Sequence, residues 1–171
     1  ADDQRQSDGT GANHQCVVAD LKALALPVYD GDIEAAGIPA GVQQLGAMIA
    51  SADAVVISSP EYNHSIAGSL KNALDWVSRL KPSPWDNKPV MLLGASPGGF
   101  GAIRGLDHAR QSFCAVGCML YSQTFALPKA HEAFDVNGAL KDKKTQERLA
   151  GVLGEYLEYA ARLMARPQQK F

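Results

Sequence analysis

Chemically active side chains are concentrated in one short stretch in the first half of the chain, SSPEYNHSIAG. This stretch places the carboxylate of Glu61, the phenol of Tyr62 and the amide of Asn63 directly after Pro60. Tyr62 offers a ring face for stacking, and Asn63 offers both donors and acceptors of hydrogen bonds. Pro60 stiffens the turn, and Glu61 can accept hydrogen bonds from backbone amides or from a partner chain. Together these residue types predict a grip on a planar ligand.

A second stretch, GASPG, matches the G-x-S-x-G nucleophile elbow of serine hydrolases. A hydrolase would use Ser96 as the nucleophile, with His108 or His131 as the base and Asp135 to orient it. In the elbow, the residue after the serine donates its backbone N–H to the oxyanion, and Pro97 has no N–H. The loss of one such donor costs about 3 kcal/mol of transition-state stabilisation. The GASPG stretch therefore gives only weak support for a serine hydrolase.

The glycines that follow, in GGFGAIRG, do not form a dinucleotide-binding fingerprint. The fingerprint G-x-G-x-x-G would need a glycine where the chain has Arg104, and Gly105 comes one residue late. Glycine lets a backbone approach a ligand closely and leaves its amide free to donate, so Gly98 and Gly99 suit a flat ligand. The alternative interpretation is a flexible turn.

Residues that could hold a metal or form a disulfide are scattered along the chain. His64 and His108 each stand alone, and no cluster of histidines or carboxylates has metal-ligand spacing. Cys16, Cys114 and Cys118 are odd in number and lack CxxC spacing. We therefore expect no metal site, and three free thiols of the kind found in a reducing cytoplasm.

Composition and charge narrow the class of protein. A chain of 171 residues is long enough for one domain with a hydrophobic core. Sixteen basic and eighteen acidic residues leave a formal net charge of −2, which gives no electrostatic reason to expect nucleic acid or an anionic membrane as a partner. No apolar run is long enough to span a bilayer. We expect a cytoplasmic protein that acts on small molecules.

Strand-like apolar segments alternate with segments of helical periodicity along the chain. The predicted strands are residues 16–21, 53–60, 90–96 and 118–127. The predicted helices are residues 42–52, 69–80, 103–117 and 144–166, and residues 25–41 are predicted to be a loop. Strands that are apolar on both faces indicate a parallel sheet covered on both sides, which binds ligands at the carboxyl ends of its strands. Both motif stretches follow predicted strands at that edge.

These motifs resemble one family, the NAD(P)H-dependent FMN reductases of flavodoxin-like fold, whose relatives include quinone, chromate and azo-dye reductases. The segment SPEYNHSIAGSLKNALDW is similar to the family signature P-E-Y-N-x-S-x-x-G-x-L-K-N-A-x-D-W. The segment KPVMLLGASPGGFGAIRGLDHARQ is similar to its second block, and LPVYDGDIE is similar to its loop after the second strand. The resemblance extends from Cys16 to Gly138.

The resemblance implies an FMN held at the strand ends. One stretch would line the ribityl chain and the isoalloxazine, and the other would cover the ring: Pro60, Glu61, Tyr62 and Asn63 in the first, and Ser96, Pro97, Gly98, Gly99 and Phe100 in the second. It also implies a ping-pong reaction, in which NADPH or NADH passes a hydride from C4 to N5 of the flavin and leaves. The acceptor then takes two electrons from the same face. Because the cofactor carries this chemistry, we expect no catalytic side chain.

Members of the family open with a strand, a Gly-Ser-x-Arg phosphate loop and a helix, which have no counterpart in this sequence. In the flavodoxin-like strand order 2-1-3-4-5 that strand is central, so we expect the functional protein to carry about thirty further residues before Ala1. The predicted fold class is α/β, a flavodoxin-like doubly wound parallel five-stranded sheet whose first strand, loop and helix are absent from this chain. The predicted organisation is a polar irregular segment, residues 1–15, and a flavodoxin-like FMN-binding domain, residues 16–171.

The expected function is FMN-dependent NAD(P)H oxidoreduction, with a quinone, free flavin, azo dye or metal oxyanion such as chromate as the acceptor. The first alternative is a non-enzymatic flavodoxin-like module that carries electrons or scaffolds an assembly. The second is a serine hydrolase that uses Ser96. These alternatives stay open at the level of sequence.

The resemblance also implies a site shared by two subunits, with the helix predicted at residues 69–80 at their contact. On that helix, the i,i+4 spacing of Asp75 and Arg79 predicts an ion pair. Trp76 lies about 100° around that helix from Val77, away from the sheet-facing stripe, and a large aromatic there needs a cover. We expect a homodimer or homotetramer with Trp76 at the contact. The alternative cover is the loop KPSPWDNKP of the same chain.

Overall fold

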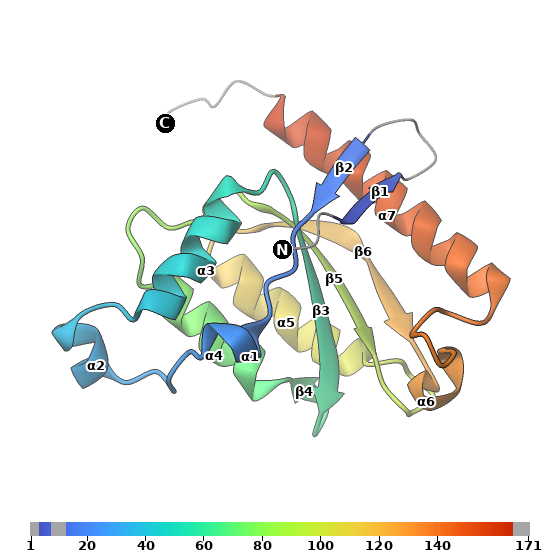
Figure 1. The fold of residues 1–171 in the computed structure, drawn as a ribbon, viewed down its shortest axis with the longest axis horizontal. Coiled ribbons are helices and arrows are strands. Elements are labelled where there is room, and N and C mark those ends of the chain that lie inside the picture. Colours follow the sequence, from blue (N-terminus) through green and yellow to red (C-terminus); the bar gives the residue numbers. More distant parts are fainter. Residues whose placement is uncertain (1–3, 8–12, 166–171) are drawn as a thin grey trace.

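Three parallel strands form the centre of the fold in the computed structural model, which describes residues 4–7 and 13–165 (Figure 1). They are β3 (Val55–Tyr62), β5 (Pro89–Ala95) and β6 (Met119–Leu127). A short strand, β4 (Ser65–Ile66), pairs antiparallel with the end of β3 and gives the order β4-β3-β5-β6. Val90, Met91 and Leu92 of β5 are almost fully buried, which is why the middle strand reads as a continuous apolar run.

Helices cover both faces of this sheet. On one face, α3 (Ala40–Ser51), α4 (Gly68–Val77) and α5 (Ile103–Ala115) enclose a core that includes Leu74, Leu92 and Phe113. On the other face, the long helix α7 (Lys143–Met164) packs Tyr156 and Ala160 against Met91 and Phe125. The mostly parallel sheet with helices on both faces confirms the predicted flavodoxin-like α/β class.

Tyr156 of α7 ties that helix to two strands. Its hydroxyl accepts a hydrogen bond from the Val55 N–H at 3.1 Å and lies 2.9 Å from the carbonyl oxygens of Val55 and Pro89, to which it can donate. The side chain is fully buried, and burial raises the pKa of its phenol. The hydroxyl therefore links α7 to backbone groups at the beginnings of β3 and β5.

The predicted strand at residues 16–21 is wrong. Only Cys16 is in a strand, at the end of β2 (Asn13–Cys16), which pairs antiparallel with β1 (Gln4–Ser7) in a separate two-stranded sheet. Val17 and Val18 are 68% and 79% exposed. A β-propensity alone does not make a strand, because the segment also needs a neighbour that pairs with it, and none of the described residues pairs with Val17 or Val18.

Two further differences concern the segments that flank this strand. Residues 1–15 were expected to be irregular, but β1 and most of β2 lie within them, and residues 1–3 and 8–12 lie outside the described residues. The predicted loop at residues 25–41 contains the short helix α2 (Gly31–Ala36), capped by the Asp30 carboxylate, which accepts from the Asp32 N–H at 2.7 Å. A four-residue helix, α1 (Leu21–Leu24), precedes it.

The other predicted helices and strands are confirmed within a few residues at their ends. The final helix was predicted to reach residue 166, which lies outside the described residues. A short helix, α6 (Ala130–Ala133), follows β6 and precedes α7. None of the helices in the described part of the chain is both long and apolar enough to cross a membrane.

Candidate functional site

The PEYN stretch is a tight β-hairpin between β3 and β4. Glu61 pairs with Ile66 and Tyr62 pairs with Ser65, so Asn63 and His64 alone form the turn. Both turn residues have positive φ, 49° and 60°, as the two central positions of a type I′ turn require. Asn and His adopt this left-handed conformation more readily than most residues. The geometry therefore gives Asn63 a conformational role that its side-chain chemistry does not reveal.

Glu61 joins the hairpin to the helix that follows the glycine-rich loop. Its Oε2 accepts a hydrogen bond from the backbone N–H of Gly105, in the first turn of α5, at 2.9 Å. This contact is close because Gly105 has no side chain: a Cβ at that position would lie 2.9 Å from the Ser65 carbonyl oxygen. The predicted ability of Glu61 to accept from a backbone amide is thus confirmed, within its own chain.

The glycine-rich loop is fixed on one side to the end of β6. The Ser96 N–H donates to the Leu127 carbonyl at 3.2 Å, and the Lys129 N–H donates to the Gly98 carbonyl at 3.2 Å. Gly101 has a φ of +60°, and a Cβ there would lie 2.7 Å from the backbone of Leu127 and Pro128. Only glycine fits at this position. These contacts pack one side of the loop against the end of β6.

The free side of the loop is formed by Gly98 and Gly99. A Cβ at Gly99 would meet no atom within 4 Å, and a Cβ at Gly98 would meet only the Ser96 hydroxyl at 3.8 Å. No described residue accepts a hydrogen bond from either amide N–H. The loop therefore presents open space and unsatisfied backbone donors, which is a suitable surface for the polar edge of a planar ligand.

Both stretches lie at the same edge of the sheet. Pro60 of β3 pairs with Ala95 of β5, so the hairpin and the glycine-rich loop begin at neighbouring strand ends (Figure 1). Two aromatic side chains at this edge are unusually exposed: Tyr62 by 61% and Phe100 by 64%. The Arg104 guanidinium lies over the Phe100 ring, 4.5 Å from its centroid. Exposed aromatics beside an open backbone fit a flat heteroaromatic ring.

Ser96 is already engaged in the structure of the loop. Its Oγ accepts a hydrogen bond from the Ala102 N–H at 3.1 Å, and the residue is buried. The proposed triad partners contact other groups. His108 lies 3.1 Å from the Ser65 hydroxyl, His131 pairs with Glu132, and Asp135 accepts from the backbone N–H groups of residues 137 and 139. The structure does not assemble the arrangement that a serine hydrolase needs.

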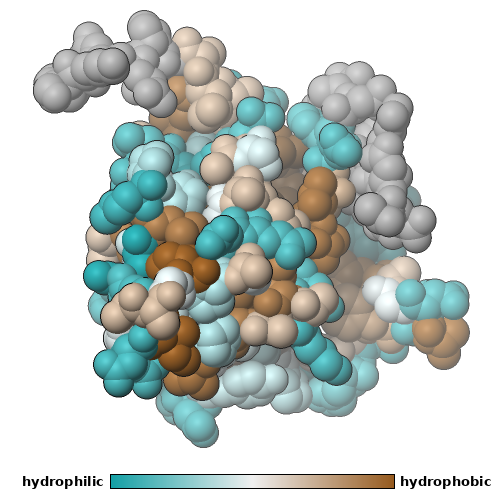
Figure 2. All heavy atoms as spheres, turned by 60° about the vertical axis from the view of Figure 1, so that its left-hand side comes forward, coloured by the Kyte–Doolittle hydropathy of each residue, from teal (hydrophilic) through white to brown (hydrophobic). Residues whose placement is uncertain are grey.

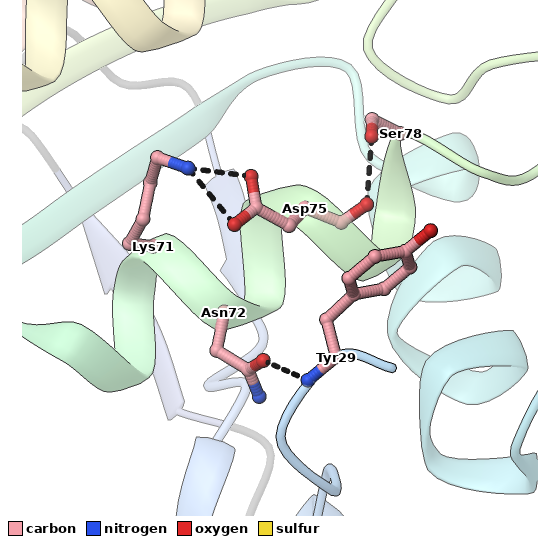
Figure 3. Close-up of polar contacts among 5 residues, drawn as sticks. All are labelled: Tyr29, Lys71, Asn72, Asp75 and Ser78. Carbon is pink, nitrogen blue, oxygen red and sulfur yellow. Dashed lines mark hydrogen bonds and ion pairs between the residues drawn. The ribbon is translucent and has the colours of Figure 1, made fainter. Parts of the chain in front are cut away.

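The helix after the hairpin, α4, binds an arm formed by residues 25–37. The Asn72 side chain accepts from the Tyr29 N–H at 2.8 Å (Figure 3), and its amide donates to the Pro27 carbonyl at 2.8 Å. Tyr29 donates through its hydroxyl to Glu34 at 2.6 Å, and Arg79 donates to the same carboxylate at 3.1 Å. These two donors lower the pKa of Glu34.

The arm corrects two predictions about α4. Asp75 pairs with Lys71 at 2.7 Å (Figure 3), and not with Arg79, whose partner is Glu34. Trp76 is fully buried by its own chain: its indole N–H donates to the Pro27 carbonyl at 2.8 Å, and Tyr29 contacts its ring at 5.0 Å between centroids. Neither a partner subunit nor the loop KPSPWDNKP is needed to explain this tryptophan.

The sequence predicts both stretches of the candidate site but does not indicate how they are held in place. It does not single out Gly101. A further glycine so soon after Gly98 and Gly99, in a loop that follows a strand, could have indicated a backbone conformation with positive φ. It does not single out Lys129, which follows β6 and donates its backbone N–H to the Gly98 carbonyl. Among the residues that the structure describes, no group of three or more histidines, cysteines or carboxylates is placed to hold a metal ion.

Comparison with known proteins gives a consistent result. The model of the NADPH-dependent FMN reductase family matches residues 5–132. The chain is 40% identical over 131 residues to an NAD(P)H-dependent FMN reductase of Pseudomonas aeruginosa, an alignment that covers 76% of this chain and 70% of that protein. It is 36% identical over 141 residues to a quinone reductase of Escherichia coli, covering 81% of this chain and 75% of that protein.

A solved structure agrees with these sequence matches. FerB, a flavoenzyme NAD(P)H:(acceptor) oxidoreductase from Paracoccus denitrificans, superimposes with a TM-score of 0.73 at 33% identity. The superposition covers 81% of this chain and 76% of FerB.

Proposed function

Because this chain belongs to the NADPH-dependent FMN reductase family, we propose that it is an FMN-dependent enzyme that oxidises NADPH or NADH and reduces a small-molecule acceptor. A quinone is the acceptor that we favour, since proteins named quinone reductase are among the relatives. Free flavin, azo dyes and metal oxyanions such as chromate are further candidate acceptors. Reduction of a quinone to a quinol consumes one NAD(P)H and one proton from solvent.

One observation carries the assignment of the site. Tyr62 and Phe100 are exposed at neighbouring strand ends, beside the open backbone of Gly98 and Gly99. We propose that these residues hold the isoalloxazine, with Pro60, Glu61 and Asn63 along the ribityl chain and Ser96 and Pro97 beneath the ring. Bound FMN supplies the redox chemistry, because it accepts a hydride and passes on two electrons.

The residues of the chain have positioning roles in this proposal. The aromatic rings of Tyr62 and Phe100 bury the ligand's flat faces and exclude water from them. The free N–H groups of Gly98 and Gly99 donate to polar atoms of the ring, and the Glu61–Gly105 hydrogen bond holds the hairpin and α5 together around it.

The test is flavin titration of the purified protein, followed by steady-state oxidation of NADPH and NADH with a quinone. Tyr62→Leu is expected to raise the Kd for FMN by about tenfold, because an aromatic contact is lost. The matched control is Tyr159→Leu on α7, which contacts Tyr121 near the start of β6, at the opposite edge of the sheet, and is expected to leave the Kd unchanged. Failure of the protein to take up FMN would end the proposal, and uptake of FMN without NAD(P)H oxidation would identify an electron carrier instead.

We also propose that the protein is a homodimer or homotetramer in the cytoplasm, with residues 16–171 acting as one FMN-binding domain. The arm supports assembly, because Val28 is 82% exposed and Ile33 is also exposed. On the face that Figure 2 turns forward, apolar residues lie in several separate groups among polar ones. Cys16, Cys114 and Cys118 are free, as a reducing compartment would allow. Sedimentation of the flavin-loaded protein tests the assembly, and a monomer at all concentrations would contradict it.

A further inference from the structure

A cationic cleft lies beside the proposed flavin site, between α6 and the first turns of α7. Its volume is about 400 Å³, which is within the range of small-molecule sites. Leu127, Pro128, Ala133 and Leu140 form its apolar wall. The cleft is therefore large enough for a nucleoside and offers a surface on which a base can pack.

The charged residues of the cleft are mostly cations: Lys129, Lys141, Lys144 and Arg148, against Glu132 and Asp142. This lining is net positive by two, whereas the whole chain has a formal net charge of −2. An anion that approaches this molecule is therefore attracted locally to the cleft, within the short range that salt screening permits.

Both carboxylates in the cleft already have partners. Asp142 caps α7 by accepting from the backbone N–H of Thr145 at 2.8 Å and from its hydroxyl at 2.6 Å, and these contacts lower the pKa of Asp142. Glu132 pairs with His131 at 3.1 Å. In contrast, Lys129, Lys141 and Lys144 form no ion pair with any described residue. The available charge in the cleft is cationic.

Arg148, which also lines the cleft, is held in position by two contacts. Its guanidinium lies over the Phe125 ring, 4.4 Å from the centroid, and one nitrogen donates to the Ala126 carbonyl at 3.2 Å. A guanidinium has five N–H donors, so most of them remain available to a ligand. An oriented arginine together with exposed lysines suits a phosphate group.

The cleft is connected directly to the loop of the proposed flavin site. Lys129, which lines the cleft, donates its backbone N–H to the Gly98 carbonyl at 3.2 Å, and Ala130 donates to the Ser96 carbonyl at 3.0 Å. An elongated molecule could therefore place one end on the loop and the other end in the cleft. A dinucleotide has that form, with a nicotinamide at one end and an adenosine at the other.

We propose that this cleft binds the 2′-phosphoadenosine end of NADPH, an inference that rests on the proposed function. A phosphate monoester carries about −1.5 to −2 charges on a single phosphate at neutral pH, which matches the net charge of the cleft, whereas the two charges of the pyrophosphate are spread over two phosphates with one charge each. The adenine would lie against the apolar wall, and the 2′-phosphate would contact Lys141, Lys144 and Arg148. The cleft thereby selects NADPH over NADH.

The experiment measures binding of adenosine 2′,5′-bisphosphate to the FMN-loaded protein by calorimetry. Replacing two exposed lysines of the cleft, Lys141→Met with Lys144→Met, is expected to raise its Kd at least tenfold. Lys143→Met is the matched control, since Lys143 is outside the cleft and pairs with Glu147 at 3.7 Å. The ratio of the KM for NADPH to the KM for NADH is expected to rise in the double variant and to stay unchanged in the control.

Three outcomes would overturn the assignment of the cleft. They are an unchanged Kd in the double variant, an equal loss in the control variant, and competition by inorganic phosphate as strong as that of the bisphosphate at the same concentration. Far-UV circular dichroism confirms that each variant is folded. The failures are distinguishable, because a protein that takes up FMN and oxidises NADH keeps the proposed function even if the bisphosphate does not bind in the cleft.

Discussion

The carboxylate of Glu61 accepts a hydrogen bond from the backbone N–H of Gly105 at 2.9 Å, and this contact joins the hairpin after β3 to the first turn of α5. The two residues are 44 positions apart in the sequence. The hairpin is thus held to α5, the helix that follows the glycine-rich loop, and this contact links the two loops of the proposed flavin site indirectly. A negative side chain near a helix N-terminus is also favoured by the helix dipole.

Glu61→Ala is expected to lower the free energy of unfolding by about 1–2 kcal/mol, because the Gly105 N–H loses a charged acceptor. Glu61→Gln keeps an acceptor oxygen and is expected to lose less than half as much. Urea denaturation of the two variants measures both values. Equal losses in the alanine and glutamine variants would show that the hydrogen bond does not stabilise the fold.

Gly98→Val and Gly101→Val are expected to fail in different ways. Gly98 has room for a side chain, so the valine variant should keep its stability and lose at least about tenfold in FMN affinity by filling the ligand's space. Gly101 has a positive φ and packs against the backbone of Leu127, so its valine variant should lose stability first. Thermal unfolding and flavin titration separate the two effects. Unchanged FMN affinity in Gly98→Val would place the ring elsewhere.

Ser96→Ala is expected to keep most of the NAD(P)H oxidation with a quinone, because Ser96 has a structural role. The variant should lose about 1 kcal/mol of stability, since the Ala102 N–H loses its buried acceptor. Ser122→Ala, at an exposed position on β6, is the control for a serine-to-alanine change. Labelling of Ser96 by an organophosphonate would contradict this interpretation and revive the hydrolase.

The arm is expected to lose stability in acid because Tyr29 and Arg79 lower the pKa of Glu34. A folded-state pKa below the unfolded value means that the unfolded chain binds more protons between the two values, so stability rises with pH across that interval. The contribution of Glu34 is therefore complete above the usual glutamate pKa of about 4.3 and is lost as pH falls through the lowered value.

Glu34→Gln tests this expectation. The difference in unfolding free energy between the wild type and this variant should be constant above the usual glutamate pKa and should shrink below it. Glu158→Gln, which removes an exposed carboxylate paired with Arg162 at 3.1 Å, controls for the general change in charge. A difference that does not vary with pH would mean that ionisation of Glu34 does not stabilise the arm.

The sequence predicts the central sheet and the helices well because their signals are local and strong. Val90, Met91 and Leu92 are buried on both faces of the sheet, which makes β5 recognisable as a continuous apolar run. The stripe on α7 that includes Tyr156 and Ala160 follows the periodicity of a helix that covers a sheet. In both cases, the spacing of apolar residues in the sequence predicts which side chains are buried in the folded protein.

Features that depend on distant residues could not be predicted in the same way. The spacing of Asp75 and Arg79 suggested a pair along α4, but Arg79 binds Glu34, 45 positions away. The cover of Trp76 comes from Pro27 and Tyr29, in a segment that reads as a loop. At the candidate site, both stretches were proposed from their residue types, whereas the turn at Asn63 and His64 depends on which strands pair and could not be predicted from those types.

The contacts of Tyr156 have a consequence for the order in which the protein is made. Its hydroxyl completes hydrogen bonds to Val55 and Pro89, which leave the ribosome 101 and 67 residues earlier. At about 5–20 residues per second, those strands emerge several seconds before the side chain that contacts them. The contacts that join α7 to the starts of β3 and β5 therefore form last, and co-translational folding of this part of the chain is completed only when α7 is synthesised.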